Sequence, residues 1–218
     1  NPEDPEIFWT FMESIEGITD FAKFLNVPCV GGKVSFYNET SNGPIKPTPL
    51  IGVLGLIENS PLLPTAPSNN DVILLVGETK DELGGSEYYE YIHNFIGGIA
   101  PKVDFSESQK NMKSVLSLIS KNLVKCAHDC SKGGLAIAIS ELCVFGKLGC
   151  DVNLTSSLSS EKMLFSESHS RYLLVVDKNN LDEIKSLLSE HDCTFSELGI
   201  FSGDQISFKS NSEPILEL

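Results

Sequence analysis

The sequence predicts an α+β protein in two units. Three stretches carry apolar residues at three- and four-residue steps, the spacing of one helical face: 7–24, 106–122 and 181–191. Apolar runs of strand length alternate with them, and Asp71–Glu78 is the clearest. The glycine pair and proline within Gly97–Asp104 mark a boundary. We therefore expect an N-terminal-type domain at 1–103 and a C-terminal-type domain at 104–218.

Composition narrows the class of protein. The chain of 218 residues is long enough for two domains, and its 41% hydrophobic content is typical of soluble globular proteins. A formal net charge of -14 argues against nucleic acid or an anionic membrane as the main partner. No apolar run reaches the ~18 residues of a membrane span. An acidic surface does not exclude a nucleotide ligand, because local N–H groups and a divalent cation can outweigh the distant field. We expect a cytoplasmic protein.

The cysteines favour the same compartment. No signal peptide precedes them, and their gaps lack the paired spacing of a zinc site. Three of them, Cys126, Cys143 and Cys150, lie among apolar residues, which predicts reduced, buried side chains that pack as small hydrophobic groups. The six are Cys29, Cys126, Cys130, Cys143, Cys150 and Cys193.

The N-terminal unit opens with a predicted helix. Pro2 and Pro5 favour an extended entry, and Asp4 can cap the helix that follows. The pattern fits one amphipathic helix or two short ones broken near Gly17, and Asn26–Pro28 ends it.

Two strands are expected next. Cys29–Glu39 reads as strand, glycine pair, strand, and its alternation places Lys33 and Ser35 on one surface, with donors suited to phosphate. A glycine bulge with solvated Lys33 and Ser35 accounts for the same pattern.

Pro49–Ile57 is predicted as a buried strand. Gly84–Ser86 is either a ligand loop or a tight turn that caps a short helix.

The stretch Cys126–Val144 contains the pattern most typical of a ligand-binding site. A short apolar segment leads to Asp129 at the start of a turn. Gly133 and Gly134 then begin a helix whose N-terminal N–H groups can bind an anion. Asp129 would offer a hard oxygen to Mg²⁺. An ordinary strand-to-helix turn capped by Asp129 is the alternative.

Beyond this stretch, the chain alternates strands with one more helix. Glu167 stands between two serines ahead of a strand, where it could accept a hydrogen bond from a sugar hydroxyl or pair with Arg171, and His169 is expected in an exposed loop. Closing strands are predicted at Cys193–Ile200 and Ile206–Lys209 and a strand at Cys150–Leu154, with a frayed tail at Asn211–Leu218.

Three motifs carry a family resemblance. They are GGKVSFYNE at 31–39, HDCSKGGL at 128–135 and LFSESHSR at 164–171. In this order they resemble the phosphoribosylformylglycinamidine synthases, which belong to the aminoimidazole ribonucleotide synthetase superfamily. Members of the smaller type contain two copies of a two-domain unit. The resemblance implies that this chain is the second copy, beginning inside its first domain. It implies a truncated sheet-plus-helices domain followed by a layered α/β domain.

The resemblance also assigns residues. It implies that Gly32 and Lys33 contact ATP and that Ser35 contacts the formylglycinamide ribonucleotide substrate. Lys33 replaces an asparagine that lies near Mg²⁺ in the family. Because an ammonium group cannot ligate a cation, Lys33 is expected to contact a phosphate directly.

A second, auxiliary nucleotide pocket follows from the family's duplication. The resemblance places Gly133, Gly134 and Glu167 in that pocket, with Asp129 as its metal ligand. It implies no catalytic residue in this chain, because the family's proposed histidine base lies in the first copy.

The implied function is that of an ATP-dependent carbon–nitrogen ligase of purine biosynthesis, with ATP and Mg²⁺ as cofactors. The implied partners are the first half of the enzyme, a glutaminase subunit that supplies ammonia, and a small bridging subunit. The fragment alone is expected to be inactive. The alternatives are a non-catalytic nucleotide-binding or structural half of that enzyme, or another ATP-dependent enzyme of the superfamily.

Overall fold

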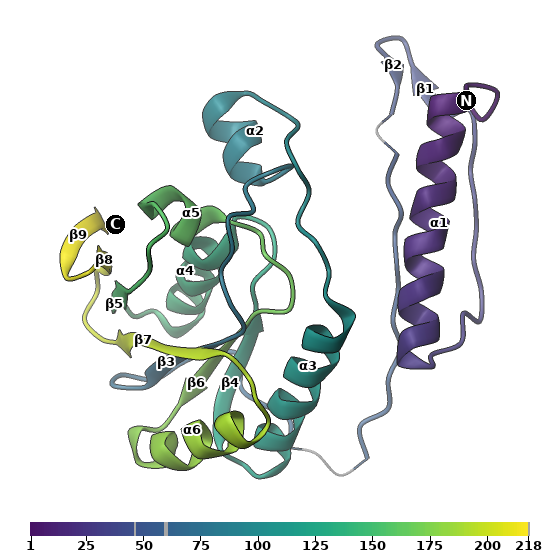
Figure 1. The fold of residues 1–218 in the computed structure, drawn as a ribbon. Helices are drawn as coiled ribbons and strands as arrows, with labels where there is room; N and C mark the ends of the chain where they lie inside the picture. The colour runs from purple at the N-terminus through teal and green to yellow at the C-terminus, as the bar shows by residue number, and fades with distance from the viewer. Residues whose placement is uncertain (46, 59–60, 218) are drawn as a thin grey trace. The chain divides into compact units, whose positions relative to one another are not determined.

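The structure is a computed structural model that describes residues 1–45, 47–58 and 61–217 (Figure 1). Its contacts divide the chain into two compact units, Asn1–Glu58 and Asn59–Leu218. This division differs from the boundary expected at 103/104, because the strand at 72–76 pairs within the sheet of the second unit. The boundary at 103/104 stays a prediction for the domain organisation of the intact protein.

The first unit is built on one long helix, α1 (Pro5–Leu25). Asp4 caps it as expected, accepting a hydrogen bond of 2.9 Å from the Glu6 N–H. Gly17 does not break the helix, which ends where Asn26 adopts a left-handed conformation with φ of 55°.

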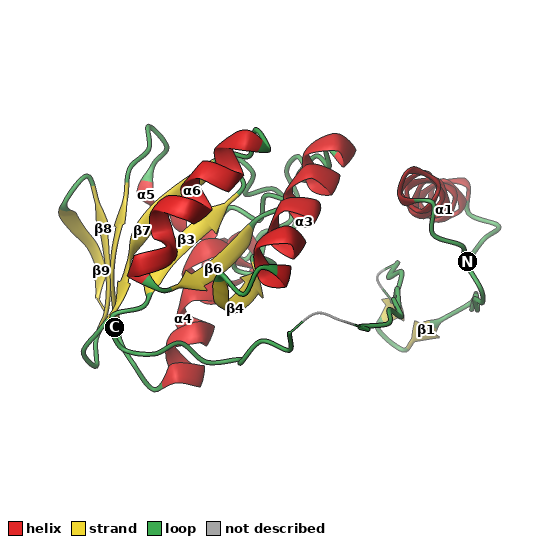
Figure 2. Cartoon of the chain, turned by 90° about the horizontal axis from the view of Figure 1, so that it is seen from below, coloured by secondary structure: helices red, strands yellow, loops and turns green. Residues whose placement is uncertain are grey.

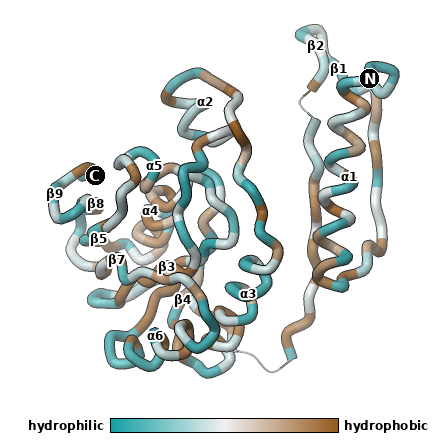
Figure 3. The backbone as a smooth tube through the Cα atoms, viewed as in Figure 1, coloured by the Kyte–Doolittle hydropathy of each residue, from teal (hydrophilic) through white to brown (hydrophobic). Residues whose placement is uncertain are grey.

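The strands expected in this unit do not form. The segment 27–38 and the described residues 47–57 have no ladder partner. The hairpin of β1 (Glu39–Thr40) and β2 (Gly43–Pro44) is the one ladder in the described part of the unit. The prediction of a buried strand at Pro49–Ile57 is therefore wrong for this chain. Figure 3 shows by its colour that much of this segment is hydrophobic. Its apolar side chains are exposed, Leu50 and Leu54 at 97% each, because no neighbouring strand covers them.

The second unit is organised around a seven-stranded sheet in the order β4-β6-β3-β7-β5-β8-β9. All neighbouring strands are antiparallel except β5 and β8. The strands are β3 (Val72–Val76), β4 (Val124–Asp129), β5 (Cys150–Leu154), β6 (Tyr172–Val176), β7 (Phe195–Phe201), β8 (Ile206–Ser210) and β9 (Glu213–Glu217).

Helices cover both faces of this sheet (Figure 2). The two-residue period of β3 sends Ile73 and Leu75 to one face and Val72, Leu74 and Val76 to the other. The first face packs against α4 (Gly134–Gly146) and α5 (Ser160–Phe165), and the second against α3 (Phe105–Ser120) and α6 (Leu181–Glu190). Two shorter helices, α2 (Glu87–His93) and η1 (Lys178–Asn180), complete the unit. The predicted α+β class is confirmed, with a layered second unit.

The C-terminal tail is ordered, contrary to expectation. β9 pairs with β8 through a turn in which Asn211 and Ser212 have φ of 49° and 73°. Two consecutive positive φ values are characteristic of the tight turns that match the twist of a hairpin. The tail prediction is wrong up to Glu217, and Leu218 lies outside the described residues.

The cysteine prediction is confirmed. All six thiols are free, and five of them are buried, with Cys29 exposed. Within the described ranges, no helix has both the length and the apolar character needed to cross a membrane.

Candidate functional site

The predicted anion-binding turn is joined by the chain's own carboxylate. Gly133 is the N-cap of α4 and has no side-chain capping bond. Its N–H donates to Oε1 of Glu167 over 2.9 Å, and the N–H of Glu87, the first residue of α2, donates to the same atom over 2.9 Å. A carboxylate at a helix N-terminus is favoured by the helix dipole. Glu167 therefore links three segments that are far apart in the sequence.

Local sequence explains this close approach. Gly133 and Gly134 have φ of 76° and 67°, a region that residues with a Cβ rarely adopt. A Cβ at Gly134 would lie 2.6 Å from the carbonyl oxygen of Ser166 and 2.9 Å from that of Leu164. The glycine pair thus lets the start of α4 reach the loop that carries Glu167.

A buried arginine holds the same loop. Arg171 is 1% exposed, and its guanidinium donates to the carbonyl oxygens of Ser168 and Ser166 over 2.9 and 2.6 Å and to Oγ1 of Thr79 over 2.9 Å. Burial lowers the pKa of Arg171 from its ordinary value. The sequence suggested a pairing of Arg171 with Glu167, but the guanidinium instead donates to the backbone of the loop and to Thr79.

Asp129 does not cap α4, so that alternative is wrong. It is the last residue of β4, and its side chain is 69% exposed. The neighbouring His128 lies between charges, with Nδ1 2.7 Å from the carbonyl oxygen of Asp129 and Nε2 3.5 Å from the carboxylate of Glu141. Asp129 is thus available as a single oxygen ligand beside the Gly133 turn. In the described part of the chain, no three His, Cys, Asp or Glu side chains gather as a metal cluster.

Gly32, Lys33 and Ser35 belong to the first unit. All three are exposed, and they lie in the extended segment before β1. A Cβ at Gly32 would meet nothing within 4 Å, so within this unit the backbone there is open. Within this unit the three residues are thus exposed on one extended segment.

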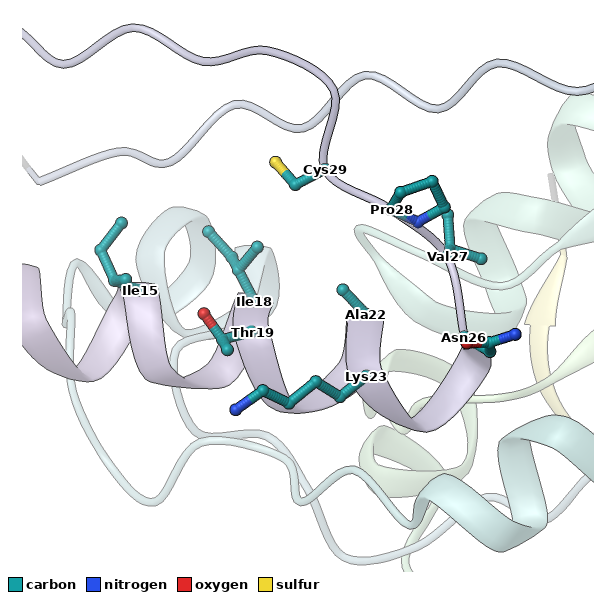
Figure 4. Close-up of a pocket in the computed structure, with 9 residues that line it drawn as sticks. All are labelled: Ile15, Ile18, Thr19, Ala22, Lys23, Asn26, Val27, Pro28 and Cys29. Carbon is teal, nitrogen blue, oxygen red and sulfur yellow. The ribbon is translucent and has the colours of Figure 1, made fainter.

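The first unit has a separate groove of about 720 Å³ (Figure 4). It lies between the C-terminal half of α1 and the turn that follows. Its lining is mainly apolar and carries one cation, Lys23. The lining residues are Ile15, Ile18, Thr19, Ala22, Lys23, Asn26, Val27, Pro28 and Cys29. None of the predicted site residues lines it.

Sequence reasoning missed the loop that completes the turn. Glu82 accepts from the N–H of Lys102 and has a second carboxylate oxygen that is buried without a partner. Its N–H donates to Oγ of Ser166 over 3.2 Å, and its carbonyl oxygen accepts from the N–H of Glu167 over 3.1 Å. The glycine pair ahead of Ser86 was the available signal, and there Ser86 acts as the cap of α2.

A family comparison accounts for this arrangement. Residues 68–209 match the family described as AIR synthase related protein, C-terminal domain. The chain is 40% identical over 215 residues to the phosphoribosylformylglycinamidine synthase subunit PurL of Pyrococcus furiosus, and 39% identical over 226 residues to that of Methanococcus aeolicus. These alignments cover 99% and 100% of the chain. The chain spans about 30% of the length of each relative.

Solved structures agree on the fold. A structure of Thermotoga maritima PurL complexed with AMPPCP superimposes with a TM-score of 0.70 at 20% identity, covering 94% of this chain and 34% of the other. The same protein complexed with FGAR gives a TM-score of 0.66 at 19% identity, covering 72% and 28%. Since the matched residues include strands β3 to β7, the Gly133 turn and the Glu167 loop, this chain belongs to the AIR synthase related family, with the family's C-terminal domain at 68–209.

Proposed function

We propose that this chain is part of an ATP-dependent carbon–nitrogen ligase. The whole enzyme would convert formylglycinamide ribonucleotide and glutamine-derived ammonia to formylglycinamidine ribonucleotide. One observation carries the proposal: relatives named as this synthase subunit align with essentially the whole chain at about 40% identity. Solved structures of Thermotoga maritima PurL complexed with ATP and with FGAR support the same nucleotide and substrate. Because the chain spans 30% of those relatives, the fragment alone is expected to be inactive.

Gly32, Lys33 and Ser35 are proposed as its contribution to the active site. The open backbone at Gly32 can approach a phosphate, and the ammonium of Lys33 can neutralise one. The hydroxyl of Ser35 would donate to the ribonucleotide substrate. In this role the chain binds and orients its ligands, and positioning of this kind supplies much of the rate in phosphoryl-transfer enzymes.

The Gly133 turn is proposed as a second, auxiliary nucleotide pocket that includes Gly134 and Glu167. Asp129 would hold Mg²⁺ there, and its exposed carboxylate fits an ion that usually takes one or two carboxylates together with phosphate oxygens. Mg²⁺, when bound, would neutralise phosphate charge. A non-catalytic nucleotide-binding half is the second candidate function, favoured by the exposed carboxylate of Asp129 beside the Gly133 turn.

The proposed setting is cytoplasmic, with three protein partners. These are the first half of the same enzyme, a glutaminase subunit and a small bridging subunit. The support is the assignment of the relatives to this synthase together with the acidic composition, which disfavours nucleic acid.

Complementation tests the proposal. The chain and the remaining part of the synthase are produced as separate polypeptides and assayed with ammonia, ATP and substrate. We expect no turnover from the chain alone and turnover from the mixture. Ser35→Ala should raise KM for the ribonucleotide, Lys33→Met should raise KM for ATP, and Ser41→Ala in the β1–β2 turn serves as the matched control. Turnover by the isolated chain, or equal kinetics in all three variants, would contradict the proposal.

Calorimetry with Mg-ADP separates the second candidate. Binding by the isolated chain that weakens in Asp129→Asn supports the auxiliary pocket. Binding that is unchanged in Asp129→Asn removes Asp129 from it. Glu141→Gln, which changes a neighbouring exposed carboxylate on α4, is the matched control.

A further inference from the structure

Side chains anchor the candidate site of the first unit to α1. The motif segment, residues 31–38, has no ladder partner. At its end, the ring of Phe36 contacts that of Phe11 on α1 edge-on, with the two ring centroids 5.2 Å apart. The hydroxyl of Tyr37 then donates to Oε1 of Glu3 over 3.1 Å, across 34 positions of the chain. Two consecutive residues therefore hold the end of the motif segment against the start of α1.

Tyr37 also turns the backbone at this point. Its φ is 58°, in the left-handed region that a bulky side chain rarely adopts. The two-residue alternation of an extended chain would place Tyr37 on the same side as Lys33 and Ser35. The left-handed backbone ends that alternation, and the Tyr37 hydroxyl is bound to Glu3. Tyr37 is thus engaged within the chain and does not extend the row of ligand-facing donors.

Asn38 links this turn to Ser35. The side-chain amide of Asn38 donates to the carbonyl oxygen of Ser35 over 3.1 Å. The carbonyl oxygen of Asn38 accepts from the N–H of Ile45 over 3.1 Å, beside the β1–β2 hairpin. A residue in a sparsely populated backbone region persists only where its surroundings hold it. Without the contact to Glu3, Tyr37 would therefore be free to return to extended backbone and to shift Ser35.

We propose that Tyr37 is a positioning residue for Ser35, with Glu3 as the acceptor that holds it. The proposal rests on the proposed function, in which Ser35 contacts the ribonucleotide substrate. Tyr37 acts through the backbone of residues 35–38 and touches no ligand itself. A binding side chain that is held in place before the substrate arrives leaves less ordering to be done on binding, which strengthens binding.

A purely structural role of the same contact has a different kinetic signature. If the contact only stabilised the first unit, its loss would lower the fraction of folded chain, and the apparent kcat would fall at unchanged KM. Loss of positioning raises KM for the ribonucleotide and leaves kcat unchanged, because the folded chain still turns over once substrate is bound.

The test uses the mixture of the full chain with the remaining part of the proposed synthase, assayed with ammonia, ATP and the ribonucleotide. Tyr37→Phe and Glu3→Ala should each raise KM for the ribonucleotide roughly twofold to tenfold, the effect of one hydrogen bond. The double variant should match the single ones, because both changes remove the same contact. Glu3→Gln keeps an acceptor and should restore the KM of the parent. Tyr91→Phe, at an exposed tyrosine of α2, is the matched control.

Tryptic cleavage after Lys33 supplies a measurement that needs no turnover. Cleavage after Lys102, in an exposed loop of the second unit, is the internal reference in the same sample. A protease needs several residues of freely moving chain, so release of the anchor at Tyr37 should expose the neighbouring bond at Lys33. Cleavage after Lys33 should accelerate roughly twofold to tenfold in Tyr37→Phe and Glu3→Ala, and it should stay at the parent rate in Glu3→Gln.

The outcomes separate the two proposals. No turnover from the parent mixture contradicts the proposed function, and the role of Ser35 falls with it. Turnover by the parent mixture with an unchanged KM in Tyr37→Phe and Glu3→Ala overturns the positioning role alone. A lower kcat at unchanged KM, or unchanged cleavage after Lys33, overturns it as well.

Discussion

The carboxylate of Glu167 lies 2.9 Å from the backbone nitrogen of Gly133, and one carboxylate oxygen accepts from the N-cap residue of α4 and from the first residue of α2. A helix N-terminus attracts anions because its first N–H groups lack partners within the helix. Here the chain supplies the anion itself. Any phosphate that uses the Gly133 turn must therefore share its N–H groups with Glu167 or displace that carboxylate.

Replacing Glu167 tests how much this contact contributes. We expect Glu167→Ala to lower the free energy of unfolding by about 1–3 kcal/mol, since hydrogen bonds to a charged group contribute about that much. Glu167→Gln keeps an acceptor and should lose about half as much. The measurement is urea unfolding, together with amide exchange at Gly133 and Glu87, whose protection should fall. Glu213→Gln on β9 is the control, and equal losses in the two Gln variants would contradict the assignment.

We expect substitution of Gly134 to lower the free energy of unfolding more than the same substitution of Gly203, which serves as its matched control. Both have positive φ, 67° and 65°, but a Cβ at Gly203 would meet nothing within 4 Å, whereas at Gly134 it would collide with three backbone atoms. Gly203→Ala should therefore lower the free energy of unfolding only by the cost of placing a Cβ at positive φ, about 1–2 kcal/mol. Gly134→Ala should cost at least about 2 kcal/mol more, because backbone cannot yield as a flexible side chain can. Thermal or urea unfolding of both variants measures the difference, and equal losses would show that α4 can shift away from the loop.

Arg171 should be intolerant of conservative change. Its planar guanidinium reaches three oxygens at once, and a lysine ammonium cannot reproduce that geometry. We expect Arg171→Lys to lower the free energy of unfolding by about 2–3 kcal/mol, because at least one buried acceptor loses its donor. Lys132→Arg, at an exposed ion pair with Glu87, is the control and should leave stability unchanged. A small effect at Arg171 would mean that water replaces the lost donors.

Helices and strands whose apolar faces pack against other parts of this chain could be predicted from the sequence. α3, α6 and β3 appear where their periodicity places them, because their apolar faces meet each other in this unit. The segment Pro49–Ile57 has an equally strong apolar run, but a strand needs a neighbour, and periodicity does not say where that neighbour lies. Its side chains are exposed for this reason.

The candidate site was predictable in its parts and not in its connections. Gly133, Gly134 and Glu167 stand out by residue type, and the structure does bring Gly133 and Glu167 together. What the pattern could not show is that the partner of the N–H group is a carboxylate 34 residues away in the same chain. Asp129 belongs to the same motif, yet it remains at the end of β4 with its carboxylate exposed.

The lowered pKa of Asp177 predicts how the free energy of unfolding changes with pH. The N–H of Asn179, followed by the charge of Lys125, lowers the pKa of Asp177 below its ordinary value of 3.8. A lowered folded-state pKa adds stability above the unfolded-state pKa, and that stability disappears as the pH falls through the folded-state value. Asp177→Asn should therefore be less stable than the parent near pH 6, and the gap should close below about pH 3. Urea unfolding across this range measures it. A gap that does not vary with pH would mean that Asp177 acts through its shape and not its charge.

The segment after α1 leads to the final prediction. Its backbone lacks ladder partners from 27 to 38, and Val30, Val53 and Leu54 are exposed at 94%, 86% and 97%. Unpaired N–H groups in exposed extended chain exchange freely with solvent, whereas paired groups in a buried strand are protected. In the isolated chain, amides at 29–38 and 50–57 should therefore exchange within seconds to minutes, while those of β3 should persist at least about a hundredfold longer. Adding the remaining part of the proposed synthase should protect these segments and leave β3 unchanged, if strands of the intact protein pair with them. Exchange measured by mass spectrometry distinguishes the outcomes. Slow exchange of these amides in the isolated chain would show that the segments pair between two copies of the chain. Continued rapid exchange in the mixture would show that the segments do not join a sheet of the intact protein.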